Sequence, residues 1–564
     1  MENFFTNPQI HGHSVRSILL ILFVGYFSVE LTAQQVLSTS NRKARKLYEK
    51  ADKKYKERSF YDALNLLEQS VEEDPLFFEA HIRMGSLYNA IGQEDSVYSK
   101  FQAYLATTPN PIVSIVERLA FMAFDRGEYE KSQTFLNRFL ANVPQRAGDR
   151  DIDLLAVSLS YAQDQILSYQ DTIVIEELPE NINQYRLQYL PSITIDNAAM
   201  FYTKRDHVQG DEDIVVSHYE NDSWQPAQSV SARINSPLNE GACTVSADGR
   251  VMIFTSCDKR DSFGSCDLYI TKKIGNIWSK PKNLGRPINS KYWESQPSLS
   301  ADGKTLYFAS NRLGGYGGRD LWISKNIDGR WTTPSNLGET INSPKDETTP
   351  FIHPNGETLY YSANGFKGMG GYDLYKAELN DTIWSLPENL GFPINTHKDE
   401  VAIIIASDGE TAFFAKEEQK NFEILDSKIV KTTLQRENQS KPTTYLIGVV
   451  LDADSKKPLE ADVQIVDLIE NQNIYRSESD AITGLFYMVL PVNLSLAAYV
   501  KKKGYLFSVY KFETNENFEV KGDTLTIYLQ KVAEGESIVL KNIYFDFDSY
   551  ELEPESKSEI ENVY

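Results

Sequence analysis

Cysteine, histidine and positive charge are all scarce in this chain of 564 residues. It has three cysteines and seven histidines, and 79 acidic residues against 57 basic ones give a net charge of −22 at pH 7. Nucleic acid needs a basic face, so this balance argues against a nucleic-acid partner. No histidine lies near the cysteines in the sequence, which argues against a zinc site.

Long apolar segments are also missing. The apolar run from Ile18 to Val29 is too short to span a membrane as a helix, which takes about 20 residues. Arg16 precedes this run and a small-residue exit, Leu31-Thr32-Ala33, follows it, as in an export signal. We therefore predict a signal peptide over residues 1–33 and an exported protein. No cysteine lies near the expected cleavage point, so a lipid anchor on an N-terminal cysteine is not predicted.

The three cysteines are Cys243, Cys257 and Cys266. An exported chain meets an oxidising compartment, in which disulfides form. Cys257 and Cys266 stand at the two ends of one expected inter-strand loop, where a hairpin brings side chains together. We predict a disulfide between these two residues and a buried thiol at Cys243.

A repeat is the clearest feature that the sequence does contain. A turn pair, Asp or Asn followed by Gly or Asn, recurs five times at intervals of 52 to 54 residues. A period in the range of about 40–50 residues, with tight turns and aromatic strands, predicts a β-propeller. The turn pairs are Asp196-Asn197, Asp248-Gly249, Asp302-Gly303, Asn355-Gly356 and Asp408-Gly409.

The ends of the repeat region predict how the propeller closes. The segment Asp171 to Glu177 stands where the preceding unit would place an outer strand, and the last unit, from about Ala402 to Thr433, lacks such a strand. We expect this segment to complete the last blade, which hides both sheet edges. The prediction is a five-bladed propeller over residues 171–434.

Three sets of side chains keep the same interval. An Asp begins one strand in each of four units, where hydrogen bonds to the preceding loop backbone explain it, with calcium binding as the alternative. A Glu opens each new unit, either as a structural residue at the blade junction or in a charged ring at the propeller mouth for a basic partner. A Trp in each outer strand packs between blades or, alternatively, forms a sugar-stacking platform. The sets are Asp213, Asp267, Asp320 and Asp373; Glu240, Glu294, Glu347 and Glu400; and Trp224, Trp278, Trp331 and Trp384.

A catalytic constellation is not recognisable in the sequence. None of the histidines that follow the predicted signal pairs with a candidate nucleophile in a known motif. The glycines of Gly368-Met369-Gly370-Gly371 belong to a loop between strands, whereas a phosphate-binding loop opens a helix. We therefore predict no catalytic residue, no cofactor and no metal, and we expect that the chain is not an enzyme.

Residues 39–168 have a helical pattern. Pro75, Pro109 and Pro144 follow one another at 34 and 35 residues, and Gly92 and Gly127 are 35 residues apart. This region resembles the tetratricopeptide family, whose repeats of about 34 residues stack into an α-solenoid. The resemblance implies a concave groove that holds peptides or partner helices.

Two further segments follow the propeller. Residues 443–531, with the strand Tyr445–Val450 and the turns at Gly484 and Gly504, resemble the carboxypeptidase regulatory-like β-sandwich. Residues 537–564, which contain Val539–Ser549, resemble the opening strand and first helix of an OmpA C-terminal domain. That α+β family binds peptidoglycan through the diaminopimelate group, and its ligand residues lie beyond this opening, so the module is expected to be incomplete at Tyr564.

The repeat units themselves resemble the WD40-like repeats called PD40, which are also found in TolB-type periplasmic proteins. The order of modules resembles periplasmic OmpA-family proteins associated with the outer membrane, and among them the peptidoglycan-tethering component of the type IX secretion system. This resemblance implies a non-catalytic envelope scaffold that links outer-membrane or secretion proteins to the cell wall. The alternative is a periplasmic propeller that senses or binds a glycan, peptide or calcium ligand.

Overall fold

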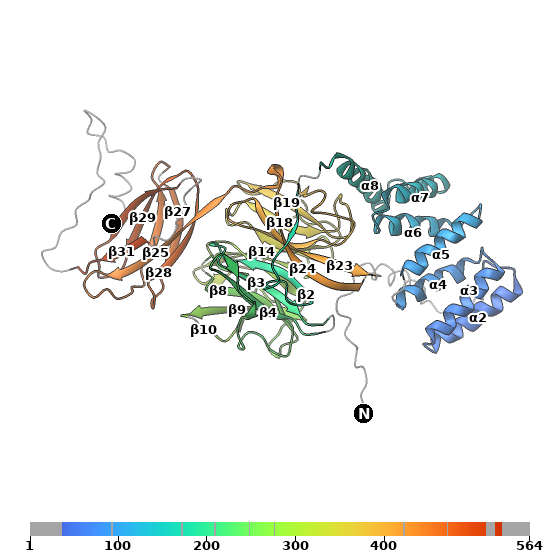
Figure 1. Cartoon of the computed structure of the whole chain (residues 1–564), viewed down its shortest axis with the longest axis horizontal. Helices are drawn as coiled ribbons and strands as arrows, with labels where there is room; N and C mark the ends of the chain where they lie inside the picture. The colour runs from blue at the N-terminus through green and yellow to red at the C-terminus, as the bar shows by residue number, and fades with distance from the viewer. Residues whose placement is uncertain are drawn as a thin grey trace, which may run out of the picture. The chain divides into compact units, whose positions relative to one another are not determined.

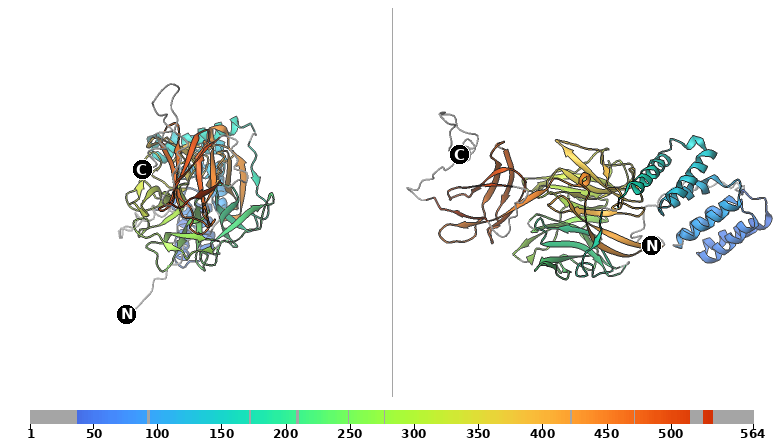
Figure 2. Two further views of the ribbon diagram at one scale, coloured as in Figure 1. Left: turned by 90° about the vertical axis from the view of Figure 1, so that its left-hand side faces the viewer. Right: turned by 45° about the horizontal axis from the view of Figure 1, so that its top comes forward.

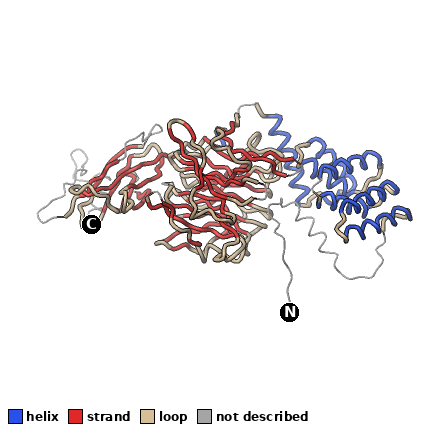
Figure 3. The backbone as a smooth tube through the Cα atoms, turned by 60° about the horizontal axis from the view of Figure 1, so that its bottom comes forward, coloured by secondary structure: helices blue, strands red, loops and turns tan. Residues whose placement is uncertain are grey.

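A computed structural model describes residues 37–91, 94–170, 173–207, 210–247, 249–275, 277–420, 423–470, 472–514 and 525–532. The predicted signal peptide and the segment that resembles an OmpA opening lie outside the described residues. In the described ranges, no helix is long and apolar enough to cross a membrane. Helices precede strands along the chain (Figure 3). The chain divides into two compact units, Met1–Ile112 and Val113–Tyr564.

The described residues of the first unit form four helices that pack against their neighbours in chain order. The first of them begins where the Asn41 side chain accepts hydrogen bonds from the backbone N–H groups of Lys43 and Ala44, which is the usual N-cap arrangement. Ala44, Leu67 and Phe101 are fully buried between the helices. The helices are α2 (Arg42–Lys56), α3 (Phe60–Glu73), α4 (Phe78–Ala90) and α5 (Glu94–Thr107).

Three more helices open the second unit. Gly127 adopts a positive φ of 70° at the turn between the first two, a conformation that glycine reaches without steric cost. The buried Ser132 hydroxyl donates to the carbonyl of Ala120 at 2.6 Å and joins these two helices. The helices are α6 (Val113–Phe124), α7 (Tyr129–Asn142) and α8 (Arg150–Ser168), with a short 3-10 turn, Pro144–Arg146, between the last two.

Five antiparallel sheets follow, and the first four are each built from consecutive strands. The second, third and fourth sheets repeat one pattern of three long strands followed by two short outer ones, and the first sheet has the same order. The strands of the first sheet are β2 (Leu187–Ile193), β3 (Ala199–Arg205), β4 (Asp213–Glu220), β5 (Ser223–Trp224) and β6 (Gln228–Ser229). Those of the second are β7 (Glu240–Val245), β8 (Val251–Cys257), β9 (Cys266–Ile274), β10 (Ile277–Trp278) and β11 (Lys282–Asn283). Those of the third are β12 (Glu294–Leu299), β13 (Thr305–Ser310), β14 (Asp320–Ile327), β15 (Arg330–Trp331) and β16 (Ser335–Asn336). Those of the fourth are β17 (Glu347–Ile352), β18 (Thr358–Ala363), β19 (Asp373–Asn380), β20 (Ile383–Trp384) and β21 (Glu388–Asn389).

The fifth sheet closes the series into a ring. It consists of β22 (Val401–Ile405), β23 (Thr411–Lys420), β24 (Glu423–Thr433) and the early strand β1 (Glu176–Glu177). Strand β1 pairs antiparallel with β24, as predicted for the segment that ends at Glu177. The first strands β2, β7, β12, β17 and β22 contact one another in this order, and β22 contacts β2. Figures 1 and 2 show these sheets gathered into one body. The structure therefore places five sheets around a common centre.

Each first strand carries one β-bulge that faces this centre. The register with the second strand shifts at the bulge, and one residue there adopts a positive φ between 44° and 63°. None of these residues is glycine, so the bulges hold strained backbone that the surrounding hydrogen bonds must stabilise. The five residues are Leu190, Ala242, Gln296, Thr349 and Ala402.

An asparagine joins each sheet to the segment that follows it, or in the fifth sheet to the segment that precedes the ring, and four of these five asparagines are buried. Asn289 donates to the Leu268 carbonyl and accepts from the Leu268 N–H, both at 2.9 Å. Its side-chain amide therefore pairs with the third strand as the backbone of a neighbouring strand would. Asn183 makes the same pair of bonds with Ile429 in β24, although 246 residues separate them. Equivalent asparagines pair with Ile214, Leu321 and Leu374 at 2.7 to 3.1 Å. They are Asn235, Asn342 and Asn395.

Two facing sheets form a sandwich after the ring. Phe486, Val463 and Val500 are fully buried between the sheets or nearly so. Gly448 lies against the Phe486 ring so closely that a Cβ atom would stand 2.0 Å from Cζ, which explains the glycine. One sheet contains β28 (Leu485–Pro491), β25 (Thr443–Asp452) and β31 (Leu525–Leu529). The other contains β27 (Gln472–Glu478), β26 (Asp462–Asp467), β29 (Ser495–Lys501) and β30 (Ser508–Glu513).

The closure of the ring predicts unequal effects for two nearby asparagines. Asn183→Ala leaves the buried N–H of Ile429 without its partner, whereas the Ile429 carbonyl still accepts the Leu178 N–H, so we expect a loss of about 1–3 kcal/mol in the free energy of unfolding. Asn181 is exposed and donates one bond to the Trp224 carbonyl, so Asn181→Ala is expected to cost less than about 1 kcal/mol. Urea denaturation of both variants measures the difference, and equal losses would contradict this account of the closure.

Candidate functional site: the loop rim of the ring

Three side chains stand side by side across the first three strands of the second, third and fourth sheets. In the second sheet Glu240 pairs with Ser256, and Ser256 pairs with Asp267. Directly paired residues point to the same face of a sheet, so the carboxyl groups of each set gather at one end of the sheet. We call this end the loop rim, formed by residues 258–265, 311–319 and 364–372 and the segments beside them. The other two sets are Glu294, Ser310 and Asp320, and Glu347, Ala363 and Asp373.

The aspartates hold the loops of the rim. Asp267 accepts hydrogen bonds from the N–H groups of Phe263 and Gly264 at 2.7 and 3.1 Å. Asp320 and Asp373 bind the N–H groups of the two equivalent residues of their own loops. The predicted bonding to loop backbone is therefore confirmed for these three, whereas Asp213 pairs with the Lys204 ammonium at 3.2 Å. In the part of the chain that the structure describes, no three His, Cys, Asp or Glu side chains lie close enough to hold a metal ion.

Each loop also touches the start of the next sheet. A Cβ atom on Gly264 would stand 1.7 Å from the Tyr292 carbonyl oxygen, and one on Gly317 would stand 1.9 Å from that of Lys345. Such distances are impossible for any side chain, so glycine is required where the loop crosses the neighbouring backbone. The recurring glycines of these loops therefore serve the contact between sheets.

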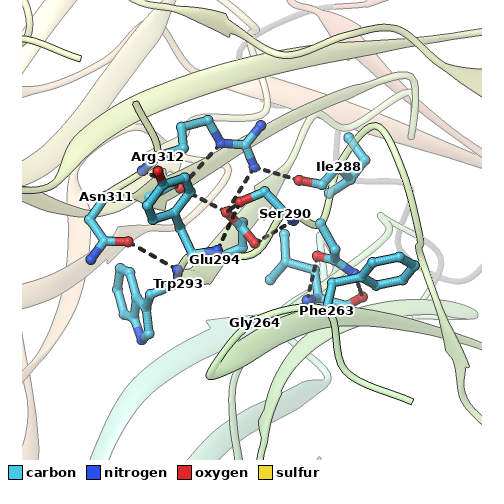
Figure 4. Close-up of polar contacts among 12 residues, drawn as sticks. Phe263, Gly264, Ile288, Ser290, Trp293, Glu294, Asn311 and Arg312 are labelled. Carbon is cyan, nitrogen blue, oxygen red and sulfur yellow. Dashed lines mark hydrogen bonds and ion pairs between the residues drawn. The ribbon is translucent and has the colours of Figure 1, made fainter. Parts of the chain in front are cut away.

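The recurring glutamates are buried, with 8% exposure or less. Glu294 accepts bonds from the N–H and hydroxyl of Ser290 at 2.8 and 2.6 Å and pairs with Arg312 at 3.1 Å. Figure 4 shows Ser290 and Arg312 both directed at this carboxylate. Glu240 makes the equivalent bonds with Ser236 and Lys259, and Glu400 is bound by Thr396. The hypothesis of a charged ring that binds a basic partner is corrected, because Glu240, Glu294, Glu347 and Glu400 expose almost no carboxylate surface.

The fourth sheet departs from this pattern at Glu347. The Glu347 side chain is fully buried, and among the groups that bind Glu294 only Ser290 has a counterpart beside it, Ser343. The serine that serves Glu294 across the strands is replaced here by Ala363, and Arg312 is replaced at the same interval by Gly365. Burial, with smaller contributions from Asp320 and Asp346, raises the pKa of Glu347 from 4.5 to about 8. Burial likewise raises the pKa of Glu400 to about 8 and that of Asp373 to about 7.

Because of this difference, replacing the recurring glutamate with glutamine should stabilise the protein in the fourth sheet and destabilise it in the third. Between pH 4.5 and 8 the folded protein keeps a proton on Glu347 that the unfolded chain releases, so stability falls as pH rises through this range. Glu347→Gln removes this loss, and we expect it to match the wild type near pH 5 and to exceed it by about 1 kcal/mol or more near pH 8.

Glu294→Gln is the matched control. It leaves the buried Arg312 guanidinium without its carboxylate, so we expect a loss of about 3–5 kcal/mol at pH 8. Urea denaturation at both pH values measures these changes. A destabilised Glu347→Gln variant at pH 8 would show that the Glu347 carboxylate is charged and bound in the folded protein.

Helices α7 and α8 cover the loop rim of the fourth sheet. The Tyr129 hydroxyl in α7 donates to the Met369 carbonyl at 2.8 Å. In α8 the Ser158 hydroxyl accepts from the Gly368 N–H at 3.2 Å, and the Tyr161 hydroxyl donates to Asn389 at 3.1 Å. Further contacts are the Asp151–Lys345 ion pair at 3.3 Å, the bond from the Phe392 N–H to Gln165 at 3.3 Å, and Lys367 over the Tyr161 ring at 4.5 Å. The sequence offered no local signal for these contacts, which join residues more than 190 positions apart.

The cysteines lie at the rim of the second sheet. Cys257 ends β8 and Cys266 begins β9, where the two are register partners, and the structure joins them by a disulfide. Cys243 is a buried free thiol whose pKa is raised by burial to about 12. The disulfide thus closes the base of the loop that carries Phe263.

The loop disulfide predicts a redox-dependent stability. Its two cysteines are nine positions apart, and a bridge over so short a loop stabilises by about 2 kcal/mol in the chain-entropy account. We expect dithiothreitol to lower the free energy of unfolding of the wild type by about this amount. The Cys257→Ser/Cys266→Ser variant should show the reduced value with or without the reductant. Equal sensitivity of both proteins to dithiothreitol would contradict the assignment.

The repeated tryptophans lie between sheets. Trp278 is 5% exposed and packs in a cluster with residues of the first and second sheets, among them Phe201 and Phe254. Trp384 meets Tyr307 of the preceding sheet edge to face, with ring centroids 6.5 Å apart. Trp224 and Trp331 join the corresponding clusters as partly buried members. This arrangement agrees with the packing hypothesis and not with a flat sugar platform.

The volumes of two cavities in the described part of the chain can be compared with those of ligand sites. One of about 90 Å³ lies at the centre of the ring, lined by the five first strands. Sites for small organic ligands usually measure roughly 300–1,000 Å³, so this cavity has room for a few water molecules. The other, of about 420 Å³, lies between α8 and the fourth sheet and is lined by polar residues such as Gln165, Asn389 and Asn438.

Comparison with known proteins finds similarity to solved structures alone, at low identity. Neither a protein-family model nor a curated protein matches the chain. Among solved structures, TolB from Acinetobacter baumannii is 15% identical, with 50% of this chain and 70% of that chain covered and a TM-score of 0.31. The putative TolB from Agrobacterium tumefaciens is 11% identical, covers 57% and 98%, and has a TM-score of 0.30. The α-L-arabinofuranosidase from Lactobacillus brevis is 13% identical, covers 46% and 96%, and has a TM-score of 0.32.

The prediction that the chain is not an enzyme is corrected by this comparison. Several of the similar structures are glycoside hydrolases, and one is a gluconolactonase from Xanthomonas campestris. A ring of sheets therefore does not exclude catalysis, because function resides in the side chains that a fold carries. Identities of 15% or less concern the fold alone and transfer no activity to this chain.

Proposed function

We propose that this chain is an exported envelope scaffold that binds outer-membrane proteins, among them type IX secretion proteins, and connects them to the cell wall. In this proposal the ring is a five-bladed PD40-type propeller, and residues 39–168 form tetratricopeptide-like repeats. The regulatory-like sandwich follows, and peptidoglycan is bound by the completed OmpA-like domain that begins at residues 537–564.

One observation carries the proposal: the loop rim of the fourth sheet already binds helices. Backbone groups of Gly368 and Met369 are satisfied by Ser158 and Tyr129, and Asp151 pairs with Lys345. The loops that make these contacts are held by buried carboxyl groups, so they meet a partner with little loss of conformational entropy. A rigid rim that binds protein in one sheet supports a protein-binding role for the ring as a whole.

Affinity capture from cell envelopes tests this function. The full chain, tagged and expressed in the cells that produce it, is expected to localise with the outer-membrane fraction and to recover outer-membrane or secretion proteins after mild crosslinking. An equally expressed, unrelated exported protein with the same tag is the control. Recovery of the same proteins by both, or a cytoplasmic location of the chain, would refute the proposal.

A further inference from the structure

One loop position is apolar in three successive sheets but is covered in only one of them. Phe263, Tyr316 and Met369 are 53 residues apart, and each donates its N–H to the aspartate that holds its loop. Met369 is fully buried, and its carbonyl accepts the Tyr129 hydroxyl of α7. Phe263 is 45% exposed and Tyr316 is 50% exposed, and Leu313 on the same loop as Tyr316 is 77% exposed. The second and third sheets thus present the apolar position that the fourth sheet buries.

One cation lies against the Phe263 ring, and two more lie over aromatic rings at the start of the third sheet. The Arg286 guanidinium lies 5.9 Å from the centre of the Phe263 ring. Arg319 lies 4.8 Å from the Trp293 ring, and Lys291 lies 5.2 Å from that of Tyr292. Of the acids on the loop of Phe263, Asp261 accepts a hydrogen bond from the Tyr269 hydroxyl at 2.9 Å. We call this surface the open rim, defined by Phe263, Arg286, Lys291, Leu313, Tyr316 and Arg319.

The covered rim of the fourth sheet shows how helices are seated on such loops. The Tyr129 hydroxyl bonds to the loop at Met369, the Tyr161 hydroxyl bonds to Asn389 of β21, and the acidic Asp151 pairs with Lys345. The Lys345 carbonyl in turn accepts the Gly318 N–H at 2.8 Å, two residues after Tyr316. The rim loop of the third sheet therefore contacts the segment that leads into the fourth sheet. The open rim thus continues directly into the part of the loop rim that α7 and α8 cover.

We propose that the open rim is the docking site for an acidic, amphipathic helix of a partner protein. Its apolar side covers Phe263, Leu313 and Tyr316, and its carboxylates pair with Arg286, Lys291 and Arg319. Tyrosine and arginine are among the residues that most often dominate binding energy in interfaces, and the open rim contains Tyr316, Arg286 and Arg319. This inference rests on the proposed function and specifies the chemistry of the partner. A second copy of this chain is a poorer occupant, because two chains of net charge −22 repel each other.

Site-specific photo-crosslinking in the full chain tests the location and the chemistry together. The photoreactive amino acid p-benzoylphenylalanine replaces Phe263 or Tyr316 in the producing cells, and mass spectrometry identifies the attached segment. Tyr219, which is 44% exposed at the far end of β4, is the matched control position. We expect both rim positions, and not position 219, to attach to a helical segment of another protein that is rich in Asp and Glu. Attachment to a second copy, to lipid or to glycan, or the absence of any rim-specific product, would overturn the proposal.

Binding of the captured segment as a synthetic peptide then tests the residues. Fluorescence anisotropy with the purified full chain should show a Kd that rises at least about tenfold in Phe263→Ala/Tyr316→Ala. Arg286→Glu should raise the Kd by about tenfold at low salt and by less at high salt, because salt screens exposed charges. Lys304→Glu, an exposed charge reversal at the turn between β12 and β13, is the matched control and should leave the Kd unchanged. Circular dichroism of each variant checks that the ring remains folded.

The outcomes separate this inference from the proposed function. If the envelope capture succeeds but the rim variants bind as the wild type does, the docking site is refuted and the scaffold function stands. If the rim captures an acidic helix of a protein that does not belong to the envelope, the docking site stands and the envelope function is refuted.

Discussion

The ring depends on one interaction that is used five times: an asparagine amide pairs with both polar backbone groups of a residue in a third strand. Without it the N–H of that residue would have no partner, at a cost of about 1–3 kcal/mol where the group is buried, while its carbonyl also accepts an N–H of the adjoining segment. The amide of Asn289 satisfies Leu268 in this way within consecutive sequence, whereas Asn183 reaches Ile429 from the start of the ring. The same side chain therefore serves both as the link between neighbouring sheets and as the closure of the ring.

Buried carboxyl groups extend this construction to the loop rim. Asp267 and Asp320 bind the N–H groups of their loops, and Glu240 and Glu294 bind the residues that enter the next sheet. Charge is tolerated there because each glutamate also meets a cation, Lys259 or Arg312. The loops are thereby held in place before any partner arrives, which lowers the entropy lost on binding. A rim of this kind presents backbone and aromatic side chains with fixed positions.

The fourth sheet shows how one unit of a repeat can be adapted. It has no counterpart of Arg312 and Ser310, which bind Glu294 in the third sheet. Its loop lies beneath α7 and α8. The acids that remain there, Glu347 and Asp373, have raised pKa values because burial disfavours their charged forms. The adapted sheet binds helices of its own chain, and the unadapted ones keep Phe263 and Tyr316 exposed.

The sequence by itself determined the ring, its period and the strand that closes it, because turns, strands and loop-holding aspartates recur at a nearly constant interval that each unit repeats locally. It also pointed to the pairing of Cys257 with Cys266, which a single hairpin brings together. The burial of Glu347 without a cation, the covering of Met369 but not of Phe263 and Tyr316, and the contact of Asn183 with Ile429 became visible in the three-dimensional structure alone. These features depend on contacts between residues separated by up to about 250 positions in the sequence. Contacts over such separations leave no periodic or local pattern in a single sequence.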